Sequence, residues 1–278
     1  MTRAAADPMS EALSDQAAGL RKLLRREALR SITVACAELT EGHGAVTANL
    51  AAALGRQGRQ VLLVDCRGRP HGAAQILGVR SDAGLRAPAP AELRVTCVAA
   101  EDARGLSRAL AGHAADADVL MVDAVPGDMA CAAASREVIL LVRPGAQGVT
   151  GGYRFLKRLE GQWGRRRILV LVDGASSRAQ ADRIFGNLSG ACRRFLNLPV
   201  EYVGFIPDDE RIRRAARLRQ TVMEAFPESE TARALGACAE RLARSPFPAD
   251  DGVADFAHRW VEAARAPQSQ SSTRFERP

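Results

Sequence analysis

The stretch 31–66 constrains the fold of this chain more than any other part of its sequence. An apolar run rich in β-branched residues, 32–34, leads into a polar turn that contains two glycines. An Ala/Leu-rich helix is predicted from there to about Gln57, and the apolar run Val61–Val64 predicts a second strand. Strand, loop, helix and strand in this order form the βαβ unit of parallel sheets. In such a unit the first loop is where backbone N–H groups bind phosphate.

Further apolar runs of strand length alternate with helical stretches along the chain. The predicted strands are Leu93–Val98, Asp118–Asp123, Glu137–Val142, Arg167–Val172 and Glu201–Phe205. The predicted helices are Asp102–His113, Thr150–Leu159, Gln180–Leu196, Asp208–Arg219 and Ser229–Ala243. This alternation indicates an α/β fold with a doubly wound, mainly parallel sheet. Ligands bind at the carboxyl ends of such strands, where Asp65 and Asp123 are expected beside the first loop. The alternative for each aspartate is that it caps the following turn.

Composition limits the class of protein. With 278 residues, of which 47% are hydrophobic, the chain has enough apolar residues for one full α/β core. Its six cysteines show no metal or disulfide spacing, which indicates reduced thiols in a cytosolic protein. No apolar run reaches the length of a signal peptide core or a membrane span. The net charge is +7, but the basic residues alternate with acidic ones, which disfavours nucleic-acid binding.

Amphipathic helices are predicted at both ends of the chain. Apolar residues recur at three- and four-residue spacing between residues 10 and 30. A Ser-Pro-Phe-Pro segment at 245–248 breaks the chain, and a second amphipathic stretch follows it. We therefore expect an N-terminal arm at 1–30, an α/β domain at 31–245, and a linker, short helix and tail at 246–278. Each terminal helix either packs on the domain or presents a binding surface.

Three short segments stand out within this frame. Residues 15–21 read DQAAGLR, residues 49–54 read NLAAAL, and residues 203–211 read VGFIPDDER. Together with the strand–helix pattern they resemble the MinD/ParA-like ATPases, which have a deviant-Walker P-loop NTPase fold. Within that family they resemble the flagellar-number regulators called FlhG or FleN. The similarity covers about residues 13–243, and the arm segment is its most specific part.

The resemblance implies a role for the arm. In flagellar regulators of this type the arm docks on an SRP-type flagellar GTPase and stimulates it. Carried over to this sequence, Gln16 completes the partner's site and Leu20 is the apolar anchor. Asp15 and Arg21 act as polar clamps, and Gly19 permits close approach.

The nucleotide loop departs from the family pattern. Counting back from Asn49, the family's GKGGVGKT falls on Ala37–Gly44. Glu38 and His43 then replace its two lysines, and Gly44 replaces the threonine that binds Mg²⁺. Arg67 replaces a second acidic residue, and Asp173 stands where an asparagine is expected to contact the base. The vestigial nucleotide site comprises Gly42, His43, Gly44, Thr47, Asp65, Asp123, Pro207 and Asp208.

Electrostatics argue against ATP binding in this loop. Two lysine charges are lost, and the carboxylates Glu38 and Glu41 face a tetra-anionic ligand. Each unit charge pair at ~6 Å and an effective dielectric near 20 is worth roughly 2–3 kcal/mol. Reversal of several such pairs weakens ATP binding by several powers of ten. The chain is therefore interpreted as a pseudo-ATPase without a resident cofactor or metal ion.

The resemblance also implies a membrane-targeting helix at the C-terminus. Val253, Phe256, Trp260 and Val261 form an apolar face suited to a membrane interface. Such a helix predicts weak association with the inner face of the cell membrane. The alternative is that Phe256 and Trp260 pack against the domain.

The leading hypothesis is a cytoplasmic, non-catalytic scaffold that resembles the flagellar regulators. The resemblance implies an SRP-type GTPase as partner, with flagellar switch proteins or a transcription factor as further partners. Two alternatives stay open. One is an ATP-switched, MinD-like ATPase that uses ATP and Mg²⁺ with an unorthodox loop. The other is an anti-activator that binds a flagellar transcription factor.

Overall fold

The computed structural model describes most of the α/β domain and one helix after it. The described residues are 29–37, 42–66, 72–79, 93–97, 117–164, 166–248 and 252–266. The DQAAGLR arm lies outside them, as do the predicted helix Asp102–His113 and the loop residues Glu38, Glu41 and Arg67.

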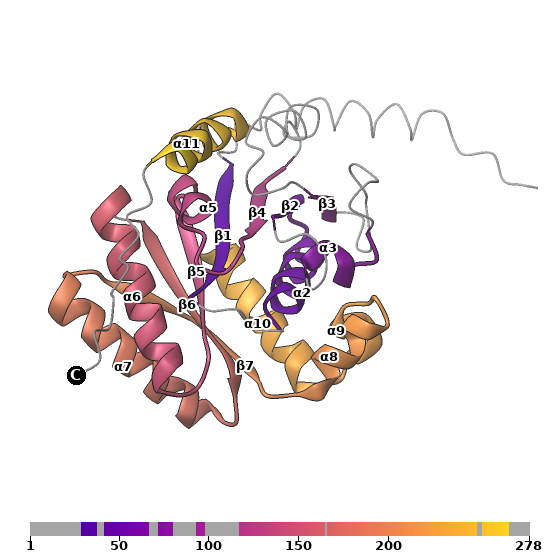
Figure 1. Ribbon diagram of the computed structural model, residues 1–278. Coiled ribbons are helices and arrows are strands. Elements are labelled where there is room, and N and C mark those ends of the chain that lie inside the picture. Colours follow the sequence, from indigo (N-terminus) through magenta and orange to yellow (C-terminus); the bar gives the residue numbers. More distant parts are fainter. Residues whose placement is uncertain are drawn as a thin grey trace, which may run out of the picture.

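The described strands form one seven-stranded sheet in which every pair is parallel. Its order is β3-β2-β4-β1-β5-β6-β7 (Figure 1). The strands are β1 (Arg30–Cys36), β2 (Val61–Asp65), β3 (Leu93–Cys97), β4 (Val119–Asp123), β5 (Glu137–Val142), β6 (Arg167–Ala175) and β7 (Val200–Pro207). The order reverses at β1, so the predicted doubly wound α/β sheet is confirmed.

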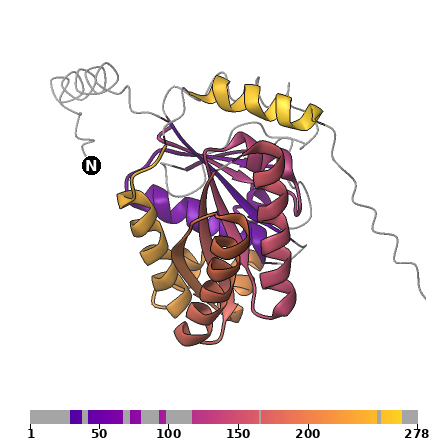
Figure 2. The ribbon, with the colours of Figure 1, turned by 90° about the vertical axis from the view of Figure 1, so that its left-hand side faces the viewer.

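Helices cover both faces of the sheet (Figures 1 and 2). One face carries α2 (His43–Arg56), α3 (Ala73–Ile76), α8 (Glu210–Arg217), α9 (Val222–Ala225) and α10 (Glu230–Arg244). The other carries α5 (Met129–Ala134), α6 (Ala146–Trp163), α7 (Arg178–Leu196) and α11 (Val253–Arg265). Alternate residues of each central strand enter the two cores, which explains why those strands are apolar throughout.

The structure agrees with the predicted elements to within a few residues. β5 has the predicted bounds, and Ser229 caps α10 by accepting a hydrogen bond from the backbone N–H of Ala232. Helix α8 is shorter than predicted, because Asp209 caps its start and the helix ends at Arg217. The short helices α3, α5 and α9 were not predicted, since four to six residues are too few to show a helical period.

Charged side chains join the amino ends of the strands to α10. Glu137 is fully buried and binds two arginines: Nε of Arg30 at 2.5 Å and Nη1 of Arg167 at 2.8 Å. Arg167 also donates to Glu201, and Arg30 donates to the carbonyl of Leu242 near the end of α10. The two arginines satisfy the buried carboxylate, so the contacts fix the strands and α10 together at this edge.

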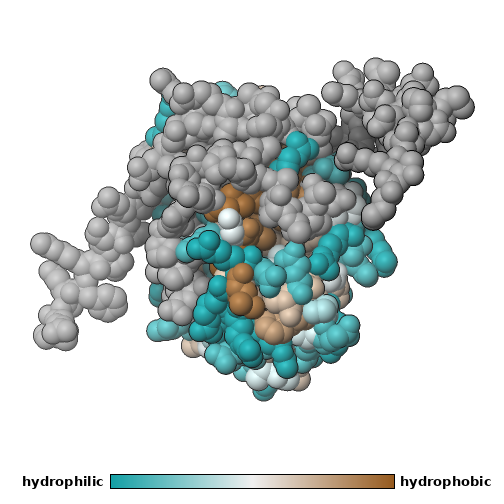
Figure 3. Space-filling model, turned by 90° about the vertical axis from the view of Figure 1, so that its right-hand side faces the viewer, coloured by the Kyte–Doolittle hydropathy of each residue, from teal (hydrophilic) through white to brown (hydrophobic). Residues whose placement is uncertain are grey.

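The surface view adds one point about exposed apolar groups. In the lower part of the face in Figure 3, brown apolar residues lie among teal hydrophilic ones. The large hydrophobic side chains most exposed among the described residues are Phe195, Leu218 and Phe247. They come from the end of α7, the end of α8 and the segment after α10, so they belong to separate elements.

Helix α11 corrects the expectation of a membrane-facing surface. Val253, Phe256 and Trp260 are buried, with Phe256 and Trp260 fully so, while Val261 is half-buried. The helix packs on α5 and joins the same core cluster, lying across one end of the molecule (Figure 2). Helix α5 consists of Ala, Cys and Met, and its small side chains leave room that the two aromatic rings of α11 fill. The face is therefore part of the core and unavailable to lipid.

No helix among the described residues is long and apolar enough to cross a membrane.

Because Trp260 is part of the core, Trp260→Glu should destabilise the fold. A charge in a fully buried site together with the lost ring should lower the melting temperature by roughly 5–15 °C. Ala264→Glu places the same charge on an exposed position of the same helix and should leave it nearly unchanged. Thermal unfolding followed by circular dichroism measures both. Equal melting temperatures for wild type and Trp260→Glu would contradict the placement of Trp260 in the core.

Candidate functional site

The candidate site lies at the carboxyl ends of the central strands, beside the start of α2. Asp65 and Asp123 end β2 and β4, and the register of these neighbouring strands pairs the two residues directly. Cys36 ends β1, and His43 is the first residue of α2. The strand order reverses at this point, which is where doubly wound sheets bind their ligands.

A buried ion pair occupies the centre of the site. Nε2 of His43 lies 3.0 Å from Oδ1 of Asp123, and both side chains are fully buried. The ring N–H is not aligned for a hydrogen bond, so the contact is a charge pair. Burial lowers the pKa of His43, but the Asp123 carboxylate and the Cys36 sulfur together outweigh this effect, and the pKa rises to about 9. His43 is therefore an imidazolium at neutral pH.

The two aspartates bind the protein's own backbone. Oδ2 of Asp123 accepts the N–H of Ala73 at 3.0 Å, and Oδ2 of Asp65 accepts that of Ala74 at 2.9 Å. These donors belong to the first turn of α3. The alternative that an aspartate caps the following turn therefore holds for Asp65, whereas Asp123 caps a helix from an earlier part of the chain. Gly72 permits the approach, because a Cβ there would lie 2.2 Å from the Asp65 carboxylate.

Thr47 completes the contacts of Asp123. Its hydroxyl donates to Oδ1 of Asp123 at 2.9 Å from one turn inside α2. Asp123 thereby receives a cation, a hydroxyl and a backbone N–H, and its charge is compensated inside the protein.

The remaining predicted site residues lie around this centre. Gly42 precedes α2 as its cap residue, and Gly44 lies in the first turn of the helix. Asp173 approaches Gly42, and burial raises the pKa of its carboxyl while Arg143 opposes the rise. Pro207 ends β7 at the far side of the same edge, and Asp208 follows it with an exposed side chain.

Two structural features of the site were not predicted from the sequence. Asn49 served only as a motif anchor in the sequence, yet its Oδ1 accepts the N–H of Val222 at 2.7 Å. It thus links α2 to the start of α9. The second feature is the contact of Cys36 with His43, where Sγ lies 2.8 Å from Nδ1. The residues are seven apart in the sequence and belong to different elements, so no periodic pattern in the sequence could reveal the contact.

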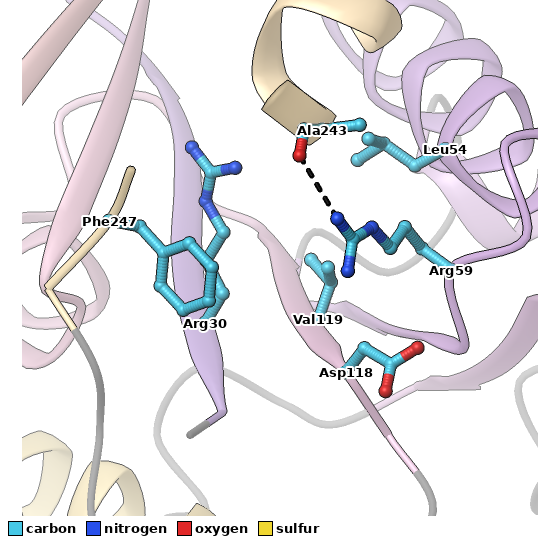
Figure 4. Close-up of a pocket in the computed structure, with 7 residues that line it drawn as sticks. All are labelled: Arg30, Leu54, Arg59, Asp118, Val119, Ala243 and Phe247. Atoms are coloured by element: carbon cyan, nitrogen blue, oxygen red, sulfur yellow. Dashed lines mark hydrogen bonds between the residues drawn. The ribbon is translucent and has the colours of Figure 1, made fainter. Parts of the chain in front are cut away.

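The described residues offer little to a phosphate or a metal ion. His43 is the only residue of the predicted nucleotide site that carries a positive charge, and Asp123 already pairs with it. Within the described ranges, no cluster of three or more His, Cys, Asp or Glu side chains could hold a metal ion. A cavity of about 270 Å³ lies at the other end of the strands, near the amino ends of β1 and β4. It is lined by Arg30, Leu54, Arg59, Asp118, Val119, Ala243 and Phe247 (Figure 4). It is therefore separate from this site.

The charge pair predicts a pH dependence of stability. The pKa of His43 is raised from 6.5 to about 9 in the folded state, so folding favours the protonated ring. The resulting stabilisation is fully present below about pH 6.5 and is lost as the pH rises through about 9. Its size is on the order of 1–3 kcal/mol. His43→Gln should lose this pH-dependent part, which urea unfolding at pH 6, 7.5 and 9 measures.

His258→Gln provides the matched control, because His258 is exposed on α11. It should follow the wild-type profile. If the free energies of unfolding of the wild type and His43→Gln differ by the same amount at all three pH values, that result would contradict a stabilising charge on His43.

Comparison with known sequences gives a partial match. No family model matches the chain. Over 150 residues it is 33% identical to the antiactivator FleN of Pseudomonas aeruginosa. The match covers 52% of this chain and 54% of FleN, so the chain spans about half the length of this curated relative.

Comparison with solved structures identifies the fold. The MinD cell division protein of Aquifex aeolicus superposes with a TM-score of 0.61 at 17% identity, over 80% of this chain and 99% of that one. MinD from Pyrococcus horikoshii, solved with Mg-ADP, gives 0.62 at 19% identity, over 78% and 96%. A ParA family ATPase from Chlorobium tepidum gives 0.58 at 19% identity, over 76% and 98%. The fold is that of the MinD/ParA P-loop NTPases.

Proposed function

We propose that this chain, a MinD/ParA-like protein of the flagellar-number-regulator type, regulates flagella in the cytoplasm without hydrolysing ATP. The observation that carries the proposal is the His43–Asp123 pair at the start of α2. It stands where the family binds the phosphates and Mg²⁺ of its nucleotide.

Hydrolysis of ATP depends on charges that stabilise the transferred phosphoryl group and on a residue that orients water. In this chain the single cation among the site residues is neutralised by Asp123. Asp65 and Asp123 are hydrogen-bonded to α3, and the hydroxyl of Thr47 points to Asp123. ATP and Mg²⁺ would have to break these buried contacts before they gained any new ones. We infer that the P-loop fold serves here as a scaffold.

The pseudo-ATPase proposal predicts very weak nucleotide binding. ATP with Mg²⁺ should bind with a Kd of about 1 mM or weaker, because no lysine faces its phosphates. Isothermal titration calorimetry on the full chain measures this, and phosphate release should not exceed background. A MinD protein with an intact loop is the positive control.

Micromolar ATP binding that requires Mg²⁺ would contradict the pseudo-ATPase proposal. It would favour the ATP-switched ATPase with an unorthodox loop.

The finer proposal concerns the arm, which lies outside the described residues. We propose that residues 10–30 dock on an SRP-type flagellar GTPase and stimulate GTP hydrolysis. The support is the DQAAGLR segment together with the partial identity to FleN. In this proposal Gln16 enters the partner's site, flanked by Asp15 and Arg21, while Leu20 anchors the helix.

A peptide of residues 10–30 should therefore raise the GTPase rate, and Gln16→Ala should lose most of the effect. Lys22→Ala changes a residue without a proposed contact and should keep it. Single-turnover GTP hydrolysis measures all three peptides. If a chain lacking residues 1–28 stimulates as well as the full chain, the arm is not the activator.

A second candidate function is anti-activation. The matched relative is named an antiactivator, which favours an α/β domain that binds a flagellar transcription factor. Capture of that factor by the full chain and by the arm-deleted chain separates the two functions. Equal capture by both chains supports anti-activation, and capture that needs the arm does not. Flagellar switch proteins are tested in the same assay.

A further inference from the structure

The contacts of His43 extend in two directions. Its Nε2 faces Asp123 at 3.0 Å, and its Nδ1 faces Sγ of Cys36 at 2.8 Å. A thiol, an imidazole and a carboxylate thus lie next to one another in space, in that order. They are contributed by β1, α2 and β4. This is the order of groups in which a base and its orienting acid activate a nucleophilic cysteine.

We propose that Cys36 is a reactive thiol that His43 and Asp123 activate, and that small hydroperoxides such as hydrogen peroxide oxidise it. The proposal concerns chemistry at the vestigial site and holds whether or not the chain binds a flagellar partner.

Charge makes the sulfur of Cys36 nucleophilic. Asp123 holds His43 as an imidazolium, whose second N–H lies against the sulfur. A neighbouring imidazolium favours the thiolate, which is the form of cysteine that attacks electrophiles. Cys192 and Cys238 differ, because burial has the largest effect on each: it raises the pKa of Cys192 to about 11 and that of Cys238 to about 12. Those thiols stay protonated at neutral pH.

A small cavity gives access to Cys36. It has a volume of about 210 Å³ and is lined by Cys36, Ala37, Leu141, Arg143, Pro144, Gln147 and Gly148. Arg143 contributes a positively charged residue to the lining of the cavity. Cys36 itself is only 3% exposed, so its burial selects small reagents over bulky ones. Hydrogen peroxide has only two oxygen atoms and carries no charge, so it is small enough to reach a buried sulfur.

The proposed step balances in atoms and electrons. The thiolate of Cys36 attacks one oxygen of hydrogen peroxide, an S–O bond forms and the O–O bond breaks. The leaving hydroxide takes the Nδ1 proton of His43 and departs as water. Sulfur is oxidised by two electrons to the sulfenic acid, and the peroxide is reduced by two. His43 is left neutral, so the charge pair with Asp123 is lost until the ring is protonated again.

The test measures each cysteine of the full chain separately. The protein is treated with hydrogen peroxide at pH 7 in the presence of dimedone, and each cysteine peptide is quantified by mass spectrometry over time. A parallel arm uses iodoacetamide, which reports nucleophilicity without an oxidant. The variants are His43→Gln and, as a matched control on a distant buried thiol, Cys192→Ser. Circular dichroism establishes that each labelled sample is folded.

We expect Cys36 to react at least about tenfold faster than Cys192 and Cys238 in the wild type. His43→Gln should remove most of this advantage, while Cys192→Ser should leave the labelling rate of Cys36 unchanged. Labelling of Cys36 no faster than that of Cys192 in the folded wild type would overturn the proposal. Fast labelling that persists in folded His43→Gln would overturn the role of the imidazole. If that variant does not fold, the comparison of thiols within the wild type decides.

Discussion

The buried pair of His43 and Asp123 is the interaction on which the rest of the site depends. It fixes the charge of the imidazole, and through the other ring nitrogen it fixes the environment of Cys36. The same carboxylate also holds Thr47 and the first turn of α3. One aspartate thus connects β4, α2 and α3 at the edge where related folds bind phosphate. These paired charges are the basis of our proposal that the site binds nucleotide weakly.

A second group of paired charges lies at the opposite end of the strands. The cluster of Arg30, Glu137 and Arg167 ties the amino ends of the strands to α10, and α11 covers α5 beside it. Both edges of the sheet are therefore built from buried charges that are paired within the chain. The scaffold role that we propose requires such an interior, in which charges are already paired before any partner binds.

Much of this fold could be predicted from the sequence, because buried parallel strands are continuous apolar runs. The observed bounds of β5, for example, equal the predicted ones. The positions of Asp65 and Asp123 followed from the same strands. Their partners did not follow, since α3 is only four residues long and its N–H groups meet the carboxylates through a glycine turn. The face of Phe256 and Trp260 was misassigned because an amphipathic period is the same for a membrane helix and a core helix.

The protonation state of the His43 ring tests the central claim most directly. Nitrogen-15 NMR of the imidazole distinguishes the doubly protonated ring from the neutral one, and it can be followed while ATP and Mg²⁺ are added. We expect a doubly protonated ring at pH 7.5 whose signals stay nearly unshifted as the nucleotide is added to about 0.1 mM, well below the expected Kd. A neutral ring at that pH, or signals that shift and saturate at micromolar ATP, would contradict it.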